Sequence, residues 1–205
     1  MKSRLYGLLI LSITLCSWLL ATPVSEHGAL KRKGTKIVGS HGNQVQIAGP
    51  SLYWSIWGGE KFYNSGVITK IATTWNASLT RASIAVEHGG YLQNPAKQLE
   101  YAKTVVNAAI ENGIYILVDW HDHNANLHLN EAKKFFTEMA KTYKNTPNVI
   151  WEIWNEPDNK HGSGSQGYDT WDDIREYADA IIPLIREYSS NLIVVGTPRW
   201  SADPA

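Results

Sequence analysis

Short apolar runs alternate with segments of helical periodicity along most of the chain. Between the runs, apolar residues recur every three or four positions, which is the spacing of one face of an α-helix. The runs themselves are apolar at successive positions, as in strands that are covered on both faces. This alternation predicts an α/β fold with parallel strands joined by crossover helices. The predicted strands are 44–50, 79–86, 114–120, 149–155 and 191–196.

Local signals mark the ends of the helices between these strands. Asn94-Pro95 opens one helix and Gly113 closes it, because proline suits the first helical turn and glycine suits the C-terminal end. Asn130 is expected to cap the next helix, and Thr170 begins a capping-box pattern before a third. The buried stripe predicted for the second of these helices comprises Phe135, Phe136, Met139 and Tyr143.

The stretch KIVGSHGNQVQI, at 36–47, predicts an N-terminal β-hairpin, because two apolar runs flank Gly-Ser-His-Gly-Asn. Two architectures fit the pattern after it: a doubly wound open sheet and a (β/α)8 barrel. No G-x-G-x-x-G sequence follows the first strand, which weakens the dinucleotide-binding form of the open sheet.

The N-terminus predicts a secretory signal peptide at 1–25. Lys2 and Arg4 form a charged start, and 5–21 is a nearly unbroken apolar run. The run has about 17 residues, which is short for a membrane span, so cleavage between 21 and 25 is favoured over a retained anchor. We therefore expect a secreted, extracellular protein without a membrane association after cleavage.

The remaining chain divides into a basic linker at 26–36, which contains Lys31-Arg32-Lys33, and a catalytic region at 37–205. The single cysteine, Cys16, lies inside the predicted leader, so the mature chain would have neither disulfides nor a thiol nucleophile. The formal net charge is +0, which gives no indication of a nucleic-acid partner. Nine Trp and ten Tyr stand against three Phe, a surplus that suits surfaces stacking on sugar rings, although most of these rings are expected in the core.

The chemistry is expected at the carboxyl ends of the strands, where both architectures place their active sites. Asp119-Trp120-His121 ends one strand and Asn155-Glu156-Pro157 ends the next. Side chains alternate along a strand, so Glu152, Trp154 and Glu156 are predicted to share one face, with Glu156 at the rim. A rim carboxylate beside aromatic rings is suited to general acid catalysis, and Asn155 next to it could hold a substrate hydroxyl.

Taken in order, these motifs resemble glycoside hydrolase family 5. Arg81 in TRASIAV, Trp120-His121 in IYILVDWH and Asn155-Glu156-Pro157 in PNVIWEIWNEP are similar to the cellulase, or endo-β-1,4-glucanase, branch of that family. The resemblance runs from about Lys36 to Ala205 and implies a (β/α)8 barrel, a retaining mechanism with two carboxylates, and a polysaccharide substrate such as cellulose. It implies no cofactor and no metal, and we expect a monomer.

The resemblance also implies a role for each matching residue. Glu156 would be the general acid/base and Asn155 would hold the sugar 2-hydroxyl. Arg81 would pair with the nucleophile, and His121 would hydrogen-bond within the cleft. Trp57 matches a tryptophan that stacks on a distal glucose ring. Tyr53 stands where many members have a histidine.

A retaining glycosidase needs a second carboxylate about 5–5.5 Å from the first. The resemblance places it near the seventh strand, whereas the pattern predicts about five strand–helix units. Glu152 lies roughly 13 Å deeper than Glu156 on an extended strand, so we interpret it as an interior acid balanced by Arg81 or Asp119. We expect the chain to be the N-terminal portion of a longer catalytic domain whose nucleophile lies beyond residue 205.

Other functions fit parts of the pattern. A β-mannanase or a mixed-linkage glucanase is the alternative within the enzyme class. A non-catalytic, glucan-binding truncated paralogue is the alternative outside it. A metal site is a third hypothesis, built on His121, Asp122, His123 and His128, but their spacing fits no familiar zinc motif.

Overall fold

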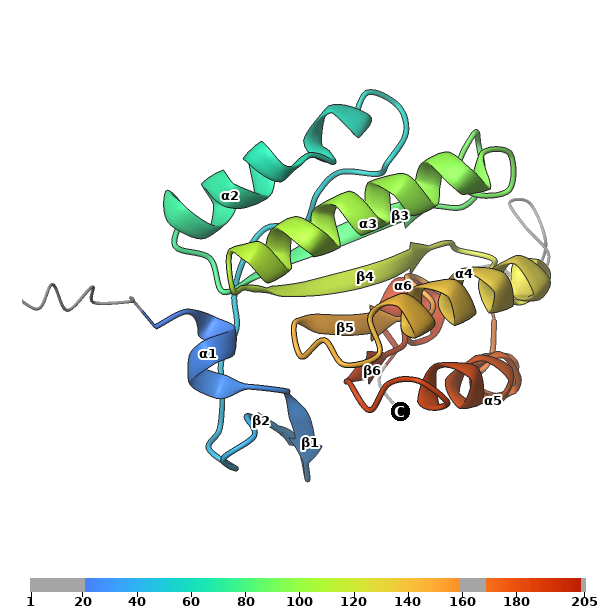
Figure 1. Ribbon diagram of the computed structural model, residues 1–205. Coiled ribbons are helices and arrows are strands. Elements are labelled where there is room, and N and C mark those ends of the chain that lie inside the picture. The colour runs from blue at the N-terminus through green and yellow to red at the C-terminus, as the bar shows by residue number, and fades with distance from the viewer. Residues whose placement is uncertain (1–20, 159–168, 204–205) are drawn as a thin grey trace, which may run out of the picture.

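The computed structural model describes residues 21–158 and 169–203, so most of the predicted leader lies outside the described residues. No helix in those two ranges is long and apolar enough to cross a membrane. Figure 1 shows the elements in chain order. They are α1 (Pro23–His27), β1 (Lys31–Lys33), β2 (Lys36–Val38), η1 (Glu60–Phe62), α2 (Ser65–Thr73), β3 (Leu79–Ala85), α3 (Pro95–Glu111), β4 (Tyr115–His121), η2 (Ala125–His128), α4 (Leu129–Thr142), β5 (Val149–Glu152), α5 (Trp171–Arg186), β6 (Ile193–Val194) and α6 (Pro198–Ser201).

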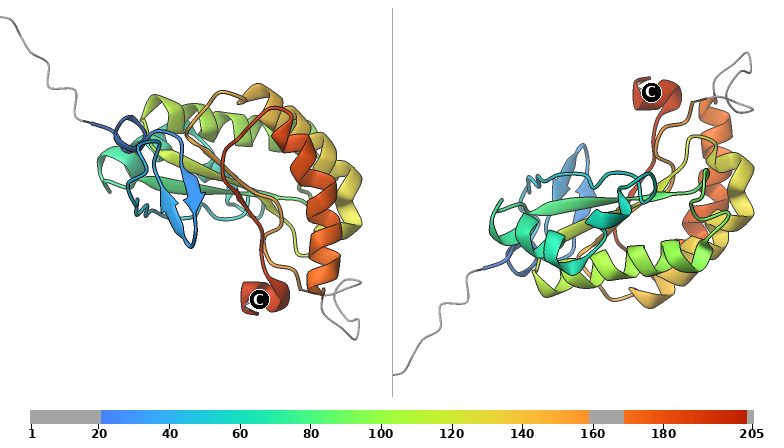
Figure 2. Two further views of the ribbon diagram at one scale, coloured as in Figure 1. Left: turned by 90° about the horizontal axis from the view of Figure 1, so that it is seen from below. Right: turned by 90° about the horizontal axis from the view of Figure 1, so that it is seen from above.

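The main sheet has four parallel strands in the order β3-β4-β5-β6. Helices α3, α4 and α5 follow one another as an outer arc on one side of it (Figure 2). A doubly wound sheet would carry helices on both faces, so the arc identifies an incomplete (β/α)8 barrel and confirms the predicted fold class.

The first strand was predicted at 44–50, but the structure places the strand-like segment slightly later, at 48–55. Ser51 bridges Arg81 in parallel, the Leu52 N–H donates to the Arg81 carbonyl at 2.8 Å, and the Ser55 N–H donates to the Ser83 carbonyl at 3.1 Å. Pro50 has no N–H to donate, so the ladder is irregular there. The segment nevertheless lies beside β3 where a first barrel strand belongs.

The N-terminal hairpin exists, but it lies earlier than predicted. Strands β1 and β2 pair antiparallel, with Lys31 opposite Val38, and Gly34 takes a positive φ of 62° in the turn between them. From the predicted hairpin, 36–47, only the bridge between Val38 and Gln44 forms. The predicted linker at 26–36 is therefore not irregular throughout, although all three residues of β1 are exposed, as expected for Lys31–Lys33.

Most predicted helix boundaries agree with the structure. Helix α3 begins at Pro95, and Thr170 forms the predicted capping box with Asp173. Asn130 is not a cap, because the chain enters α4 directly from η2 and no side chain caps its first turn. Helix α2 was not predicted at all. The predicted residues Phe135, Phe136 and Met139 are buried on α4, and Tyr143, the C-cap residue that follows the helix, is buried as well.

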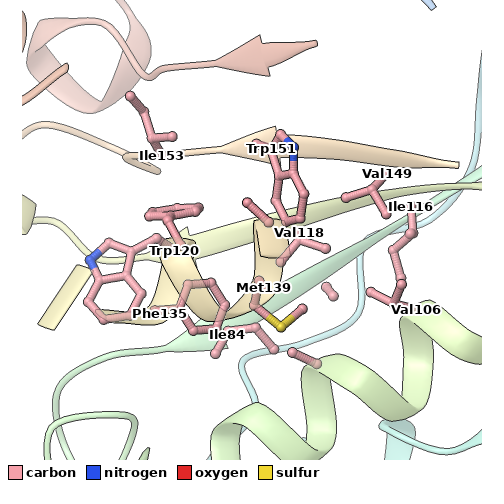
Figure 3. Close-up of a cluster of buried hydrophobic side chains, with 14 of the residues drawn as sticks. Ile84, Val106, Ile116, Val118, Trp120, Phe135, Met139, Val149, Trp151 and Ile153 are labelled. Carbon is pink, nitrogen blue, oxygen red and sulfur yellow. The ribbon is translucent and has the colours of Figure 1, made fainter. Parts of the chain in front are cut away.

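The main core lies between the sheet and the helical arc. In Figure 3, side chains from β3, β4 and β5 meet those from α3 and α4, with Trp120, Trp151 and Phe135 among them. A smaller cluster lies apart from it and contains Leu30, Val45, Tyr115 and Ile150. Tyr115 and Ile150 stand near the amino ends of their strands, so the N-terminal segment packs at that end. The carboxyl ends are left for polar side chains.

Candidate active site

Arg81 joins the three central strands through their polar side chains. Its Nε lies 2.7 Å from Glu152 Oε2, and its Nη2 lies 2.9 Å from Asp119 Oδ2. The parallel register places Asp119 opposite Glu152 on β4 and β5, so one guanidinium reaches both acids. Arg81 Nη2 also donates to Asn155 Oδ1 at 2.7 Å. The prediction that Arg81 or Asp119 balances Glu152 is confirmed for Arg81.

Burial makes Asp119 and Glu152 harder to ionise. Burial raises the pKa of Asp119 to about 8, and Arg81 opposes this shift. Burial likewise raises the pKa of Glu152 to about 7, with Asp119 adding to the shift and Arg81 opposing it. Burial also acts against the charge of Arg81, but Asp119 and Glu152 outweigh it and raise the Arg81 pKa. The network therefore holds one cation against two carboxyl groups that retain protons more readily than usual.

His121 is buried at the end of β4. Its Nδ1 lies 2.5 Å from Asp119 Oδ2, and its ring meets Trp54 edge-on with centroids 4.1 Å apart. Burial lowers the pKa of His121 to about 4, so the imidazole is neutral near pH 7. A neutral ring that donates from Nδ1 presents Nε2 as an acceptor. His121 is thereby suited to hydrogen-bond a hydroxyl group.

Asn155 and Glu156 lie side by side with different surroundings. Asn155 is 6% exposed. Its Oδ1 accepts from Arg81, and its Nδ2 has no hydrogen-bond partner among the described residues. A buried amide donor without a partner is uncommon and suits a ligand acceptor. The Glu156 side chain is 41% exposed, with Oε2 3.6 Å from His123 Nε2. The pair thus combines a fixed donor with an accessible carboxyl group.

The predicted shared face of Glu152, Trp154 and Glu156 is wrong in one respect. Strand β5 ends at Glu152, and both Ile153 and Trp154 are fully buried in the main core. The Tyr177 hydroxyl donates to the Ile153 carbonyl at 2.9 Å, and the Tyr177 ring lies 5.0 Å from that of Trp154. Strict alternation fails because the chain bends at Ile153. Glu156 therefore reaches the rim through a bend and not along a strand.

Trp57 forms an exposed aromatic surface on the loop after the first barrel segment. It is 58% exposed, lies 5.2 Å from the Trp54 ring and stacks on His88 at 5.6 Å. Trp54 also contacts His121, so Trp57 is linked through one ring to the polar network. The prediction of a ring that stacks on a sugar is compatible with this placement.

Tyr53 lies elsewhere. Its side chain, 53% exposed, lines an apolar groove of about 400 Å³ together with Phe62 and Trp75. None of the interactions found among the described residues joins this side chain to Arg81 or His121. The structure thus does not gather Tyr53 with the other candidate residues, and its role stays a prediction.

The histidines considered for a metal site each face a different carboxylate. His121 pairs with Asp119, and His128 Nδ1 lies 2.8 Å from Asp122 Oδ2. His123 lies nearest Glu156. In residues 21–158 and 169–203, no group of three or more potential ligands is arranged to hold a metal ion. The donor set therefore does not converge on one point.

Comparison with known proteins identifies the family. Residues 38–205 match the family model described as cellulase (glycosyl hydrolase family 5). The chain belongs to glycoside hydrolase family 5. Among curated relatives, it is 40% identical over 200 residues to Endoglucanase Z of Dickeya dadantii, covering 96% of this chain and 43% of that protein. It is 37% identical over 191 residues to an endoglucanase of Clostridium saccharobutylicum, covering 89% of this chain and 40% of that protein.

Solved structures superpose closely on this chain. One from Cytophaga hutchinsonii is 43% identical with a TM-score of 0.82, over 88% of this chain and 56% of that chain. The catalytic domain of Thermobifida fusca endoglucanase Cel5A is 32% identical with a TM-score of 0.79, over 88% and 57%. A variant of that enzyme has been solved with cellotetraose. The chain thus spans less than half of these curated relatives and somewhat more than half of these solved domains.

Sequence reasoning named Asp122 and His128 only as possible metal ligands and missed that they pair with each other. Asp122 is buried, accepts the Asn124 N–H at 2.9 Å and pairs with His128. The hydrogen bond between His128 and Asp122 raises the pKa of His128. The pair ties the loop after β4 to the start of α4. The six-residue spacing of Asp122 and His128 gave no periodic signal, because the intervening turn is irregular.

Proposed function

We propose that this chain forms the acid/base side of the active site of a secreted, retaining endo-β-1,4-glucanase that cuts internal bonds of cellulose. The observation that carries the proposal is the buried Asn155 amide, whose N–H group lacks a partner among the described residues, next to the accessible carboxyl group of Glu156. The cellotetraose complex of the Thermobifida fusca relative supports a β-1,4-glucan as the substrate class.

In this mechanism, Glu156 first acts as an acid. Its carboxyl group gives a proton to the glycosidic oxygen as the bond to the leaving sugar breaks, and a second carboxylate attacks the anomeric carbon. Glu156 then acts as a base and takes a proton from the water that hydrolyses the glycosyl-enzyme. Asn155 Nδ2 donates to the sugar 2-hydroxyl, and this bond strengthens as charge develops on the ring.

The other residues position the sugar. Neutral His121 accepts from a substrate hydroxyl, and Trp57 stacks on a glucose ring away from the reacting bond. Glu152 is not assigned as the nucleophile, because it is buried at the end of β5, four residues before Glu156, whereas a retaining pair needs carboxyl groups about 5–5.5 Å apart. We assign the nucleophile to a later strand that follows residue 205 in the intact enzyme, close enough to contact Arg81.

A chimera tests this assignment. Residues 22–205 are joined to the remaining C-terminal part of the catalytic domain of Endoglucanase Z, and release of reducing ends from carboxymethylcellulose is measured. We expect hydrolysis by the chimera and a fall in kcat of roughly 10²–10⁴-fold in Glu156→Gln. Glu100→Gln is the matched control, because Glu100 is exposed on α3 and pairs with Lys97 of the same helix. An active Glu156→Gln chimera would exclude Glu156 as the acid/base.

Binding without hydrolysis is the second candidate, and the exposed ring of Trp57 favours it for this polypeptide alone. The 205-residue chain is mixed with cellulose, and both the bound fraction and the released sugar are measured. Retention on cellulose without sugar release fits a chain that lacks its nucleophile. Hydrolysis at the rate of the chimera would show that the nucleophile lies within residues 1–205. Parallel assays on β-mannan and mixed-linkage glucan separate the alternative substrates.

A further inference from the structure

The segment Thr22–Gly28 belongs to the folded domain. Thr22 caps α1 reciprocally: its backbone N–H donates to Ser25 Oγ at 2.7 Å, and its Oγ1 accepts the Ser25 N–H at 3.3 Å. The Gly28 N–H closes the helix on the Val24 carbonyl at 2.8 Å. These bonds satisfy both ends of a helix that is too short to be stable by itself.

This short helix is held against the amino end of the barrel. The Val24 N–H donates to the Gly113 carbonyl at 3.0 Å, and the Tyr115 hydroxyl donates to the Gly28 carbonyl at 2.6 Å. Gly113 has a positive φ of 65°, and a side chain there would collide with Thr22. The Thr22 side chain therefore occupies the space left by a glycine at the junction of α3 and β4.

Ala21, the residue before Thr22, does not belong to this capped helix. It is exposed and lies outside α1, and it is the last residue of the apolar run 5–21. It is also small, as leader peptidases require at the residue before the cleaved bond. Cleavage between 22 and 25 would remove the cap or the contact with Gly113, whereas cleavage after Ala21 removes neither.

We propose that the leader is removed between Ala21 and Thr22, so that Thr22 is the mature N-terminus. The inference rests on the proposed secretion. A leader peptidase of the exporting cell adds one water across this peptide bond, which leaves a carboxylate on Ala21 and an ammonium group on Thr22. The new ammonium group still donates to Ser25 Oγ, so the cap of α1 survives processing.

The test uses the complete 205-residue chain, expressed with its leader in a secretion-competent bacterium. The exported protein is analysed by intact mass and N-terminal sequencing. We expect it to begin at Thr22. A protein that begins at Pro23 or later, or that keeps residues 1–21, would overturn the proposal. Ala21→Tyr should abolish cleavage at this bond, whereas Glu26→Tyr, at another exposed position, should leave it unchanged.

A second measurement examines the physical basis. Two leaderless chains, one starting at Thr22 and one at Ser25, are unfolded thermally, and the chain from Ser25 should have the lower Tm. Equal Tm values would remove the structural reason for cleavage before Thr22. Neither experiment depends on hydrolysis. If the chimera were inactive but the exported 205-residue chain began at Thr22, the proposed glucanase activity would be rejected and the cleavage site would stand.

Discussion

At the scale of residues, the guanidinium of Arg81 contacts two buried acids, and these contacts set the charge of the candidate site. Asp119 and Glu152 face each other across neighbouring strands, and each contacts the same guanidinium. Burial raises the pKa of both carboxyl groups because it removes water from their charged forms, and the one guanidinium offsets this only in part. A nucleophile in contact with Arg81 would add a further carboxylate to this network.

The first prediction concerns pH and stability. Burial raises the pKa of Glu152 to about 7 from its ordinary value of 4.5, so the folded state binds the proton more tightly. Its contribution is fully present below the unfolded pKa and is lost as the pH rises through about 7. The urea midpoint should therefore fall between pH 5 and pH 8, and Glu152→Gln should reduce that fall. An unchanged pH dependence in Glu152→Gln would contradict this account.

The second prediction concerns His121, whose pKa shift leads to the opposite dependence of stability on pH. Burial lowers its pKa to about 4 from 6.5, so its contribution is present above the unfolded pKa and is lost as the pH falls through about 4. His121→Asn should make the chain less sensitive to acid than the wild type. The measurement is the urea midpoint at pH 7 and at pH 4, with His41→Asn as the exposed control. Equal acid sensitivity in all three chains would argue against a buried neutral imidazole.

The third prediction concerns Asn155. Asn155→Asp keeps an acceptor for Arg81 but removes the N–H donor assigned to the sugar 2-hydroxyl. In the chimera, kcat/KM for a cello-oligosaccharide should fall by roughly 10²–10³-fold, the range for a donor aimed at developing charge. A 2-deoxy substrate should show a much smaller loss, because the missing hydroxyl has no bond to lose. Equal losses on the two substrates would reject this role for Asn155.

At the scale of elements, the ends of the helices decide how the loops leave the barrel. Thr170 Oγ1 accepts the Asp173 N–H at 3.3 Å, and Asp173 Oδ2 accepts the Thr170 N–H at 2.8 Å. This reciprocal cap sets the start of α5, which carries Tyr177 against the bend after β5. The position of Asn155 and Glu156 therefore depends partly on a helix end far from them in sequence.

The fourth prediction tests this cap. Thr170→Ala removes the side-chain acceptor and should lower the free energy of unfolding by about 1 kcal/mol. Thr104→Ala, in the middle of α3, is the matched control and should cause no loss, because alanine favours a helix interior. Urea denaturation of the two variants measures the difference. A loss in Thr104→Ala as large as that in Thr170→Ala would mean that the cap adds nothing specific.

At the scale of the whole molecule, the barrel arc has two ends. The segment 48–55 pairs with β3, and β6 pairs with β5. Beside the first lies the apolar groove whose rim includes exposed Tyr53, Phe62 and Trp75. Parallel strands with an unpaired edge and adjacent exposed aromatic rings promote association.

The fifth prediction follows from this exposed surface. The isolated 205-residue polypeptide should self-associate with rising concentration in light-scattering measurements, whereas the chimera with a closed barrel should remain a monomer. Trp75→Lys should weaken self-association, and Trp171→Lys, at another exposed tryptophan, should not. A monomeric chain at all concentrations would indicate that the groove is covered by some other means.

Much of this organisation follows from the sequence alone. Hydrophobic periodicity located β3, α3 and β4 closely, and capping chemistry located the start of α5, because these signals depend on neighbouring residues. The motifs around Arg81, His121 and Asn155-Glu156 indicated the family before any geometry was known. The structure joined Arg81 to Asn155 directly and to His121 through Asp119.

Other features were decided only by tertiary structure. The chain bends at Ile153, where the carbonyl accepts from Tyr177 of α5, 24 residues later in the chain, and no local signal indicates this contact. The contact of one guanidinium with both Asp119 and Glu152 arises from the register of three strands. Asn155 Nδ2, which has no partner among the described residues, is placed by the chain that follows β5. Docking of Thr22 against Gly113 joins residues about ninety positions apart in the chain. Local patterns specify elements, whereas contacts between distant elements set burial, charge and the positions of atoms in the site.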